Sequence, residues 1–161
     1  MTGVQTCALP ISEVVGDTLY IGYRKGFSFT YLKALKNLNN CEVDITAPEL
    51  ISLELNGSGL IISNPFYYNE LDIRLSGSGR IETSGAAEEL FIDCNGSGRV
   101  IARDLISKKI RIVLTGAGLA EINAEDEIEA SLTGSGKIIY WGNPAVTKTV
   151  SGSGDIIQAK K

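Results

Sequence analysis

The sequence predicts an all-β fold, a parallel β-helix (β-solenoid) with about 19 residues in each coil. Three observations predict it: a glycine triplet that recurs at nearly constant spacing, apolar residues at every second position around that triplet, and a repeat too short for pairs of helices. A strand–turn–strand unit of this size cannot cover its own apolar face. Stacking one unit on the next does cover it, as in solenoid proteins.

Six Gly-x-Gly triplets mark the repeats. Their first glycines are separated by 20, 19, 20, 18 and 18 residues, whereas helix-pair repeats need about 33 residues and propeller blades about 40. Asn, Ser or Thr precedes every triplet, which is typical of turns. We therefore expect a corner at each triplet, where glycine permits positive φ or close approach of stacked backbones. The triplets occupy residues 57–59, 77–79, 96–98, 116–118, 134–136 and 152–154.

Two other uses of glycine fit these triplets less well. A phosphate-binding loop joins a strand to a helix and carries Lys-Ser/Thr or a third glycine at fixed spacing, whereas here strand follows strand. A calcium β-roll needs an Asp in each turn, but Asp155 is the sole carboxylate among the six residues that follow the triplets. We expect no cofactor and no metal site.

Apolar residues recur at four positions of each repeat: two, four and six residues before the first glycine and four residues after it. Of these 24 positions only Lys148 is not apolar. Such a period of two is typical of strands with one buried face. We predict that Cys94 is a small core residue, and that its phase differs from that of Cys41, which argues against a disulfide between them. The position two before the triplet should form one interior row of Leu55, Leu75, Cys94, Leu114, Leu132 and Val150.

The composition excludes several classes of function. The 161 residues include no His, which removes Ser-His-Asp and Cys-His catalysis and the commonest metal ligand. The chain has 19 acidic and 15 basic residues, a net charge of −4 and no basic stripe, so we expect no nucleic-acid partner. It contains no apolar run of about 18 residues, so no membrane span is predicted.

Three segments are predicted along the chain. Residues 1–11 resemble the translation of a sequencing-library adapter, and we interpret them as a non-native leader. Residues 12–40 are expected to hold a remnant coil and an irregular loop, with a strand over residues 13–23 and a loop or short helix over residues 24–40. Residues 41–161 form the predicted repeat domain.

The repeated (Leu/Val)-(Asn/Ser/Thr)-Gly-Ser-Gly-x-Ile resembles a known family. Together with residues 46–50 (Thr-Ala-Pro-Glu-Leu) and the closing residues 140–144 and 150–156, it is similar to the auto-transporter adhesin head GIN domain over about residues 41–158. The resemblance implies a right-handed parallel β-helix, exported to the cell surface or periplasm of a Gram-negative bacterium. It implies no catalytic residue.

Two aromatic clusters fall at corresponding positions of different repeats. Phe66 and Trp141 each lie eleven residues before a triplet glycine. We expect the clusters to mark one corner of the helix, several coils apart. Packing of these rings against a neighbouring loop is the favoured interpretation, and contact with a carbohydrate or a cell-surface protein is the alternative. The clusters are Phe66, Tyr67 and Tyr68 in one repeat, and Tyr140 and Trp141 in the other.

These observations predict a non-enzymatic, exported module, either an adhesin head or another cell-surface binding or structural domain. The alternative function is a polysaccharide-active enzyme on the same scaffold, which needs two carboxylates about 5–9.5 Å apart on one face. No set of acidic residues recurs without gaps in successive coils, so a solvated surface is favoured. A third interpretation is a spacer, or a module that associates with itself through an open amino-terminal coil. The acidic residues considered are Glu82, Glu88, Glu89, Glu121, Glu125, Asp126, Glu127 and Glu129.

Overall fold

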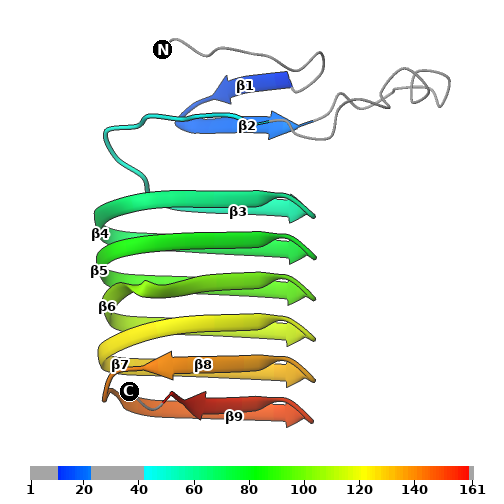
Figure 1. Ribbon diagram of the computed structural model, residues 1–161, viewed down its shortest axis with the longest axis vertical. Coiled ribbons are helices and arrows are strands. Elements are labelled where there is room, and N and C mark those ends of the chain that lie inside the picture. Colours follow the sequence, from blue (N-terminus) through cyan, green and yellow to red (C-terminus); the bar gives the residue numbers. More distant parts are fainter. Residues whose placement is uncertain (1–10, 23–41, 160–161) are drawn as a thin grey trace, which may run out of the picture. The chain divides into compact units, whose positions relative to one another are not determined.

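The structure is a computed structural model that describes residues 11–22 and 42–159. The chain divides into two compact units, Met1–Pro48 and Glu49–Lys161, and each is described by itself. The regular elements of the described residues are all β-strands, and the second unit is a stack of coils (Figure 1). The predicted fold class, a β-solenoid with coils of about 19 residues, is confirmed.

The first unit contains a β-hairpin within residues 11–22. Strands β1 (Ile11–Val15) and β2 (Thr18–Gly22) pair antiparallel. The single strand predicted over residues 13–23 is therefore wrong, because Gly16 and Asp17 form a two-residue turn within it, with Gly16 at φ 62°. Positive φ at the first turn residue but not at Asp17 matches a type II′ hairpin turn, which favours glycine at that first position.

Some sequence predictions concern residues that the structure does not describe. The leader before residue 11, the loop or helix over residues 24–40, and Cys41 all lie outside the described residues. The boundaries of the three predicted segments stay a prediction.

The second unit is built from parallel strands that follow one another around the coils. Successive strands break only at the last two residues of each triplet or at residues 142–144, so a strand such as β6 runs through nearly a whole coil. The sheet order is β10-β8-β7-β6-β5-β4-β3, with β9 also paired to β7. The strands are β3 (Ser52–Gly57), β4 (Leu60–Gly77), β5 (Arg80–Gly96), β6 (Arg99–Gly116), β7 (Leu119–Gly134), β8 (Lys137–Trp141), β9 (Ala145–Gly152) and β10 (Asp155–Gln158).

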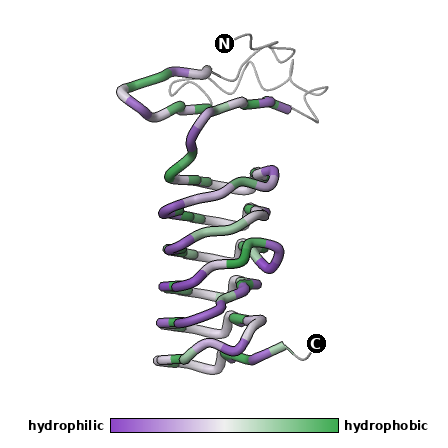
Figure 2. The backbone as a smooth tube through the Cα atoms, turned by 90° about the vertical axis from the view of Figure 1, so that its left-hand side faces the viewer, coloured by the Kyte–Doolittle hydropathy of each residue, from purple (hydrophilic) through white to green (hydrophobic). Residues whose placement is uncertain are grey.

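The four predicted apolar rows form the interior. The strand register places Leu55, Leu75, Cys94, Leu114, Leu132 and Val150 opposite one another in sequence, so the predicted row is confirmed. Its central members are fully buried, whereas Val150 in the last coil is 43% exposed. Lys148, the polar exception, pairs with Ala130 and is exposed in that same last coil. Figure 2 shows the even stacking of the coils.

Each coil has three faces. In β6 two consecutive exposed residues, at 103–104 and at 108–109, interrupt the alternation of buried and exposed positions. These interruptions are corners, and the triplet makes a further corner. We name the segments between them the first, second and third face in chain order. The buried residues of β6 are Val100 and Ala102 on the first face, Leu105 and Ser107 on the second, and Ile110, Ile112 and Leu114 on the third.

The triplet corners need glycine for two separate reasons. Gly57 and Gly96 both have φ +116°, a conformation that L side chains rarely adopt. At Gly96 a Cβ would also lie 2.5 Å from the carbonyl oxygen of Gly77 in the preceding coil, while at Gly57 it would meet nothing within 4 Å. The same Gly77 oxygen accepts a 2.9 Å hydrogen bond from the Ser97 N–H. Close stacking thus adds to the requirement for positive φ.

Candidate binding surface

One outward row on the second face connects two of the predicted aromatic residues. The register pairs Tyr67, Ala86, Ile106, Asn123 and Trp141 in successive coils. With about 4.8 Å between strands, Tyr67 and Trp141 stand about 19 Å apart along the stack. We call these five residues the aromatic row. Counting back from the following triplet pairs Phe66 with Trp141, but the ladder between β6 and β7 slips between Ser107 and Lys109, so the correspondence is off by one residue.

Tyr67 is exposed and held in place from its polar end. Its ring is part of a residue that is 60% exposed, and its hydroxyl donates a 2.8 Å hydrogen bond to Glu88 Oε1. Lys108 Nζ, one coil further on, donates to both oxygens of Glu88 at 2.9 and 2.7 Å. The bonds from Lys108 and Tyr67 lower the pKa of Glu88, and the bond to Glu88 raises the pKa of Tyr67. Three consecutive coils therefore orient one aromatic ring.

Of the other four predicted aromatic residues, one is buried and three are half-buried. Tyr68 is only 2% exposed, and its hydroxyl lies 2.6 Å from Ser63 Oγ. Phe66 packs against Tyr68 with ring centroids 5.2 Å apart, and Phe66 and Tyr140 are both half-buried against the core. Trp141 is half-buried. The structure thus removes Tyr68 from the surface, because its phase in the strand points it inward. Tyr67 and Trp141 remain as the surface candidates.

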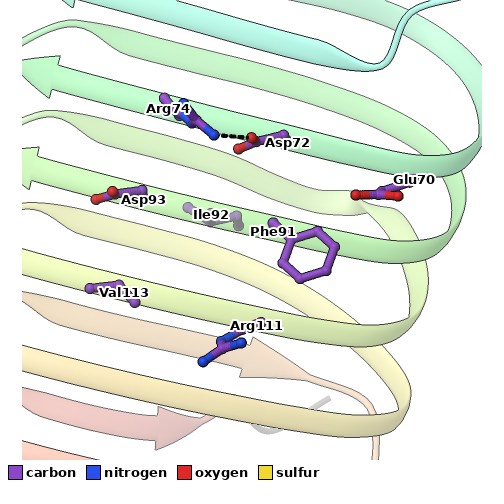
Figure 3. Close-up of a pocket in the computed structure, with 8 residues that line it drawn as sticks. All are labelled: Glu70, Asp72, Arg74, Phe91, Ile92, Asp93, Arg111 and Val113. Atoms are coloured by element: carbon purple, nitrogen blue, oxygen red, sulfur yellow. Dashed lines mark hydrogen bonds and ion pairs between the residues drawn. The ribbon is translucent and has the colours of Figure 1, made fainter.

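A shallow depression on the third face was not singled out from the sequence. It has a volume of about 420 Å³ and lies over β4, β5 and β6 (Figure 3). Phe91 stands at its centre, between the Asp72–Arg74 pair and Arg111. The sequence does contain an indication of this depression, because Phe91 occupies an outward position, five residues before the triplet that begins at Gly96. In the other repeats that outward position holds Ser52, Asp72, Arg111, Glu129 and Thr147.

Charged groups of both signs surround Phe91. Arg74 Nη2 donates to Asp72 Oδ2 at 2.7 Å, and this bond raises the pKa of Arg74. Arg111 Nε lies 3.5 Å from Glu129 Oε2, with both side chains more than half exposed. Asp93 pairs with Arg74 in the strand register but forms no side-chain hydrogen bond with the described residues. Exposed pairs of this kind contribute little to stability, so these groups are available to a ligand.

Three of the acidic residues considered from the sequence are held by hydrogen bonds or ion pairs, and the thiol of Cys94 is buried. A general acid needs a raised carboxyl pKa, whereas the pKa of Glu88 is lowered by its two donors. Burial raises the pKa of the Cys94 thiol to about 11, so this cysteine is protonated and unreactive. Two of the acidic residues considered from the sequence, Glu82 and Glu129, form ion pairs with Arg80 and Arg111. The part of the chain that the structure describes brings together no group of three or more metal-ligating residues.

The fold and these surfaces define a class of protein: a β-solenoid with a closed apolar interior whose chemistry lies on flat outward faces. Within that class, the chain belongs to the family described as "Putative auto-transporter adhesin, head GIN domain", which matches residues 11–144. The resemblance stated from the repeats is confirmed. No curated protein matches the chain.

Three solved structures share the fold. A "putative adhesin" from Bacteroides fragilis is 22% identical, with a TM-score of 0.72 over 94% of this chain and 77% of that one. A "putative adhesin" from Parabacteroides merdae is 18% identical, with a TM-score of 0.53 over 94% and 78%. A "putative lipid binding protein" from Parabacteroides distasonis is 22% identical, with a TM-score of 0.50 over 94% and 79%. At these identities the likeness shows the fold alone.

Within residues 11–22 and 42–159, the structure has no helix of the length and hydropathy needed to cross a bilayer.

Proposed function

We propose that the chain is a non-enzymatic, exported binding module of the adhesin type, and that the aromatic row contacts a carbohydrate or a protein on a cell surface. The observation that carries the proposal is the exposed ring of Tyr67, held by Glu88 and Lys108 on a rigid stack of coils. The family and the adhesin-like solved structures support the same class of function.

The aromatic row has the features of a contact surface. Aromatic rings give large contact areas with few rotatable bonds, and Tyr67 and Trp141 stand near the two ends of the row. Ile106 between them is 46% exposed, and Ala86 leaves a step beside Tyr67. Orienting a side chain before binding reduces the entropy lost on association. A ligand that spans several coils would therefore meet a surface that is already ordered.

The absence of catalysis and the export are parts of the same proposal. The pKa of Glu88 is lowered and its carboxylate is bonded to Tyr67 and Lys108, which suits a structural role for the best-ordered carboxylate near the aromatic row. Export is supported by the adhesin family. The alternative, a polysaccharide-active enzyme, predicts release of reducing ends from a polysaccharide, and an assay of that release would contradict the proposal if it were positive.

Binding to mucin-coated surfaces tests the aromatic row. The full chain and the variants Tyr67→Ala and Trp141→Ala should be compared by biolayer interferometry, with Ile62→Ala as the matched control. Ile62 is 63% exposed and lies on the first face, so its truncation removes apolar surface outside the row. We expect the two row variants to lose at least about tenfold in affinity, since an aromatic anchor contributes on the order of 1–2 kcal/mol or more. Equal binding by all four proteins, or no binding by the wild type, contradicts the proposal.

A further inference from the structure

The depression around Phe91 has the composition of a ligand site, and it lies on a different face from the aromatic row. The outward positions of the third face form two columns, three and five residues before each triplet. Among these twelve positions, all within the described residues, Phe91 and Val113 are the only apolar ones. The register sets Val113 beside Arg111 and opposite Asp93, so the two apolar residues are diagonal neighbours. The polar members are Ser52, Glu54, Asp72, Arg74, Asp93, Arg111, Glu129, Ser131, Thr147 and Thr149.

The apolar part of the site faces solvent. Val113 is 42% exposed and Phe91 is half-buried, while Ile92, the next residue after Phe91, is 2% exposed and belongs to the core. In Figure 3 the ring of Phe91 stands clear of the ribbon. The partly negative face of an aromatic ring attracts C–H groups that carry partial positive charge. A flat ligand with an apolar side can therefore lie on this ring.

The backbone of the third face cannot take part in recognition. Strand β5 pairs with β4 on one side and β6 on the other, so its N–H and C=O groups are used in the ladder. A peptide that adds itself as a strand needs a free sheet edge, and none exists at the depression. Recognition must come from side chains, and the ligand must bring its own hydrogen-bonding groups.

The charges around the ring favour a ligand without net charge. Carboxylates of Glu70, Asp72 and Asp93 and guanidinium groups of Arg74 and Arg111 line the same depression. An anionic ligand would meet the carboxylates, and a cationic one would meet the two guanidinium groups. Hydroxyl groups can donate to Asp93 and accept from Arg111, because among the described residues Asp93 forms no side-chain hydrogen bond and Arg111 forms only a long ion pair.

We infer that the third face holds a second binding site, in which a neutral saccharide stacks on Phe91 and bonds through its hydroxyls to Asp93 and Arg111. A sugar ring combines a C–H face with hydroxyl groups around its rim, which is the complement of a ring surrounded by charged side chains. The volume of about 420 Å³ lies within the range of about 300–1,000 Å³ for small-molecule sites.

A printed glycan array that carries neutral, sialylated and sulfated glycans identifies the probe, and calorimetry with the best neutral glycan then measures its affinity. We expect binding to neutral glycans and about tenfold weaker binding by Phe91→Ala, while Phe91→Tyr, which keeps the ring, stays within about threefold of the wild type. Asp93→Asn should weaken binding, and Ile62→Ala on the first face should not. Binding only to charged glycans, or an unchanged affinity of a folded Phe91→Ala variant, overturns the inference.

A measurement on the unaltered chain removes any dependence on the folding of variants. Addition of the neutral glycan should shift the methyl resonances of Val113 and leave those of Ile157, on the first face, in place; the reverse pattern overturns the inference. The inference does not depend on the aromatic row. If mucin binding requires Tyr67 and the third face binds no neutral glycan, this second site alone is rejected. If neutral-glycan binding requires Phe91 and the chain does not bind mucin, the aromatic row alone is rejected.

Discussion

The two demands on the triplet glycines can be separated by one pair of substitutions. Gly57→Ala and Gly96→Ala place the same methyl group at the same φ of +116°. At Gly57 the new Cβ has nothing within 4 Å, whereas at Gly96 it would lie 2.5 Å from the Gly77 oxygen and 3.2 Å from its carbonyl carbon. The first variant therefore reports backbone strain alone, and the second adds the cost of close stacking.

The expected losses follow from these contacts. A residue without glycine's freedom in a sparsely populated backbone region costs about 1–3 kcal/mol, which is the whole effect expected for Gly57→Ala. At Gly96 the coils must separate by several tenths of an ångström, which adds about 1–3 kcal/mol of overpacking. That shift also stretches the Ser97–Gly77 hydrogen bond, which is worth about 1 kcal/mol. Gly96→Ala should thus lose about 2–4 kcal/mol more than Gly57→Ala.

Urea unfolding followed by circular dichroism measures both losses. Ser97→Ala is the control for an interior corner, because Ala117 already occupies that triplet position in the next coil, and it should change stability by less than about 0.5 kcal/mol. Hydrogen exchange of the Ser78 N–H, which donates to Gly57 O at 2.9 Å, checks that the first triplet corner stays folded in the Gly57 variant. Equal losses for Gly57→Ala and Gly96→Ala would refute the argument that stacked backbones require glycine.

Three further predictions concern single side chains of the second unit. Cys94 is buried with its pKa raised to about 11, so iodoacetamide at pH 8 should leave it unmodified in peptide mass spectra until urea unfolds the chain; labelling of the native chain would contradict its place in the core. Thr83→Val removes a buried hydroxyl that has no hydrogen-bond partner among the described residues. The free energy of unfolding in urea should therefore stay unchanged or rise by up to about 1 kcal/mol. A loss of more than about 1 kcal/mol would contradict the absence of a partner for this hydroxyl. The lowered pKa of Glu88 stabilises the fold above the pKa of the unfolded carboxyl, about 4.3, and this contribution disappears as the pH falls through the lower folded pKa. Glu88→Gln should therefore flatten the acid side of the Tm–pH profile, and an unaltered profile would show that the bonds to Tyr67 and Lys108 carry no stability.

The coils and their interior could be predicted because the same apolar period and the same glycine triplet recur in six successive repeats. A period of two decides which side of a strand each residue occupies, and six triplets set the register from coil to coil. The row through Cys94 and Leu114 follows from counting back two residues from each triplet, and the structure pairs these two residues as expected.

The corners could not be predicted in the same way. Coils of 18 to 20 residues stack on one another, so the extra residues must be taken up where the ladder slips, and the sequence does not say where. The slip between Ser107 and Lys109 moves the counterpart of Trp141 from Phe66 to Tyr67. The phase of Tyr68 turns its side chain into the core. The hairpin at Gly16 escaped prediction because the alternation of Leu19 and Ile21 was extended back across the turn.

The depression at Phe91 could be predicted from the sequence only in part. Its phase is outward and its neighbours in the same position are polar, so the sequence contains the signal. The cavity itself depends on how side chains of three coils lie beside one another, which a single repeat does not show.

Because alternate residues of every coil leave the interior, this architecture separates what evolution must keep from what it can vary. Substitutions at outward positions leave the packed column unchanged, whereas substitutions at inward positions disturb its packing. Two chains can therefore differ at many outward positions and keep one architecture, and a solved structure only 22% identical to this chain superposes on it with a TM-score of 0.72.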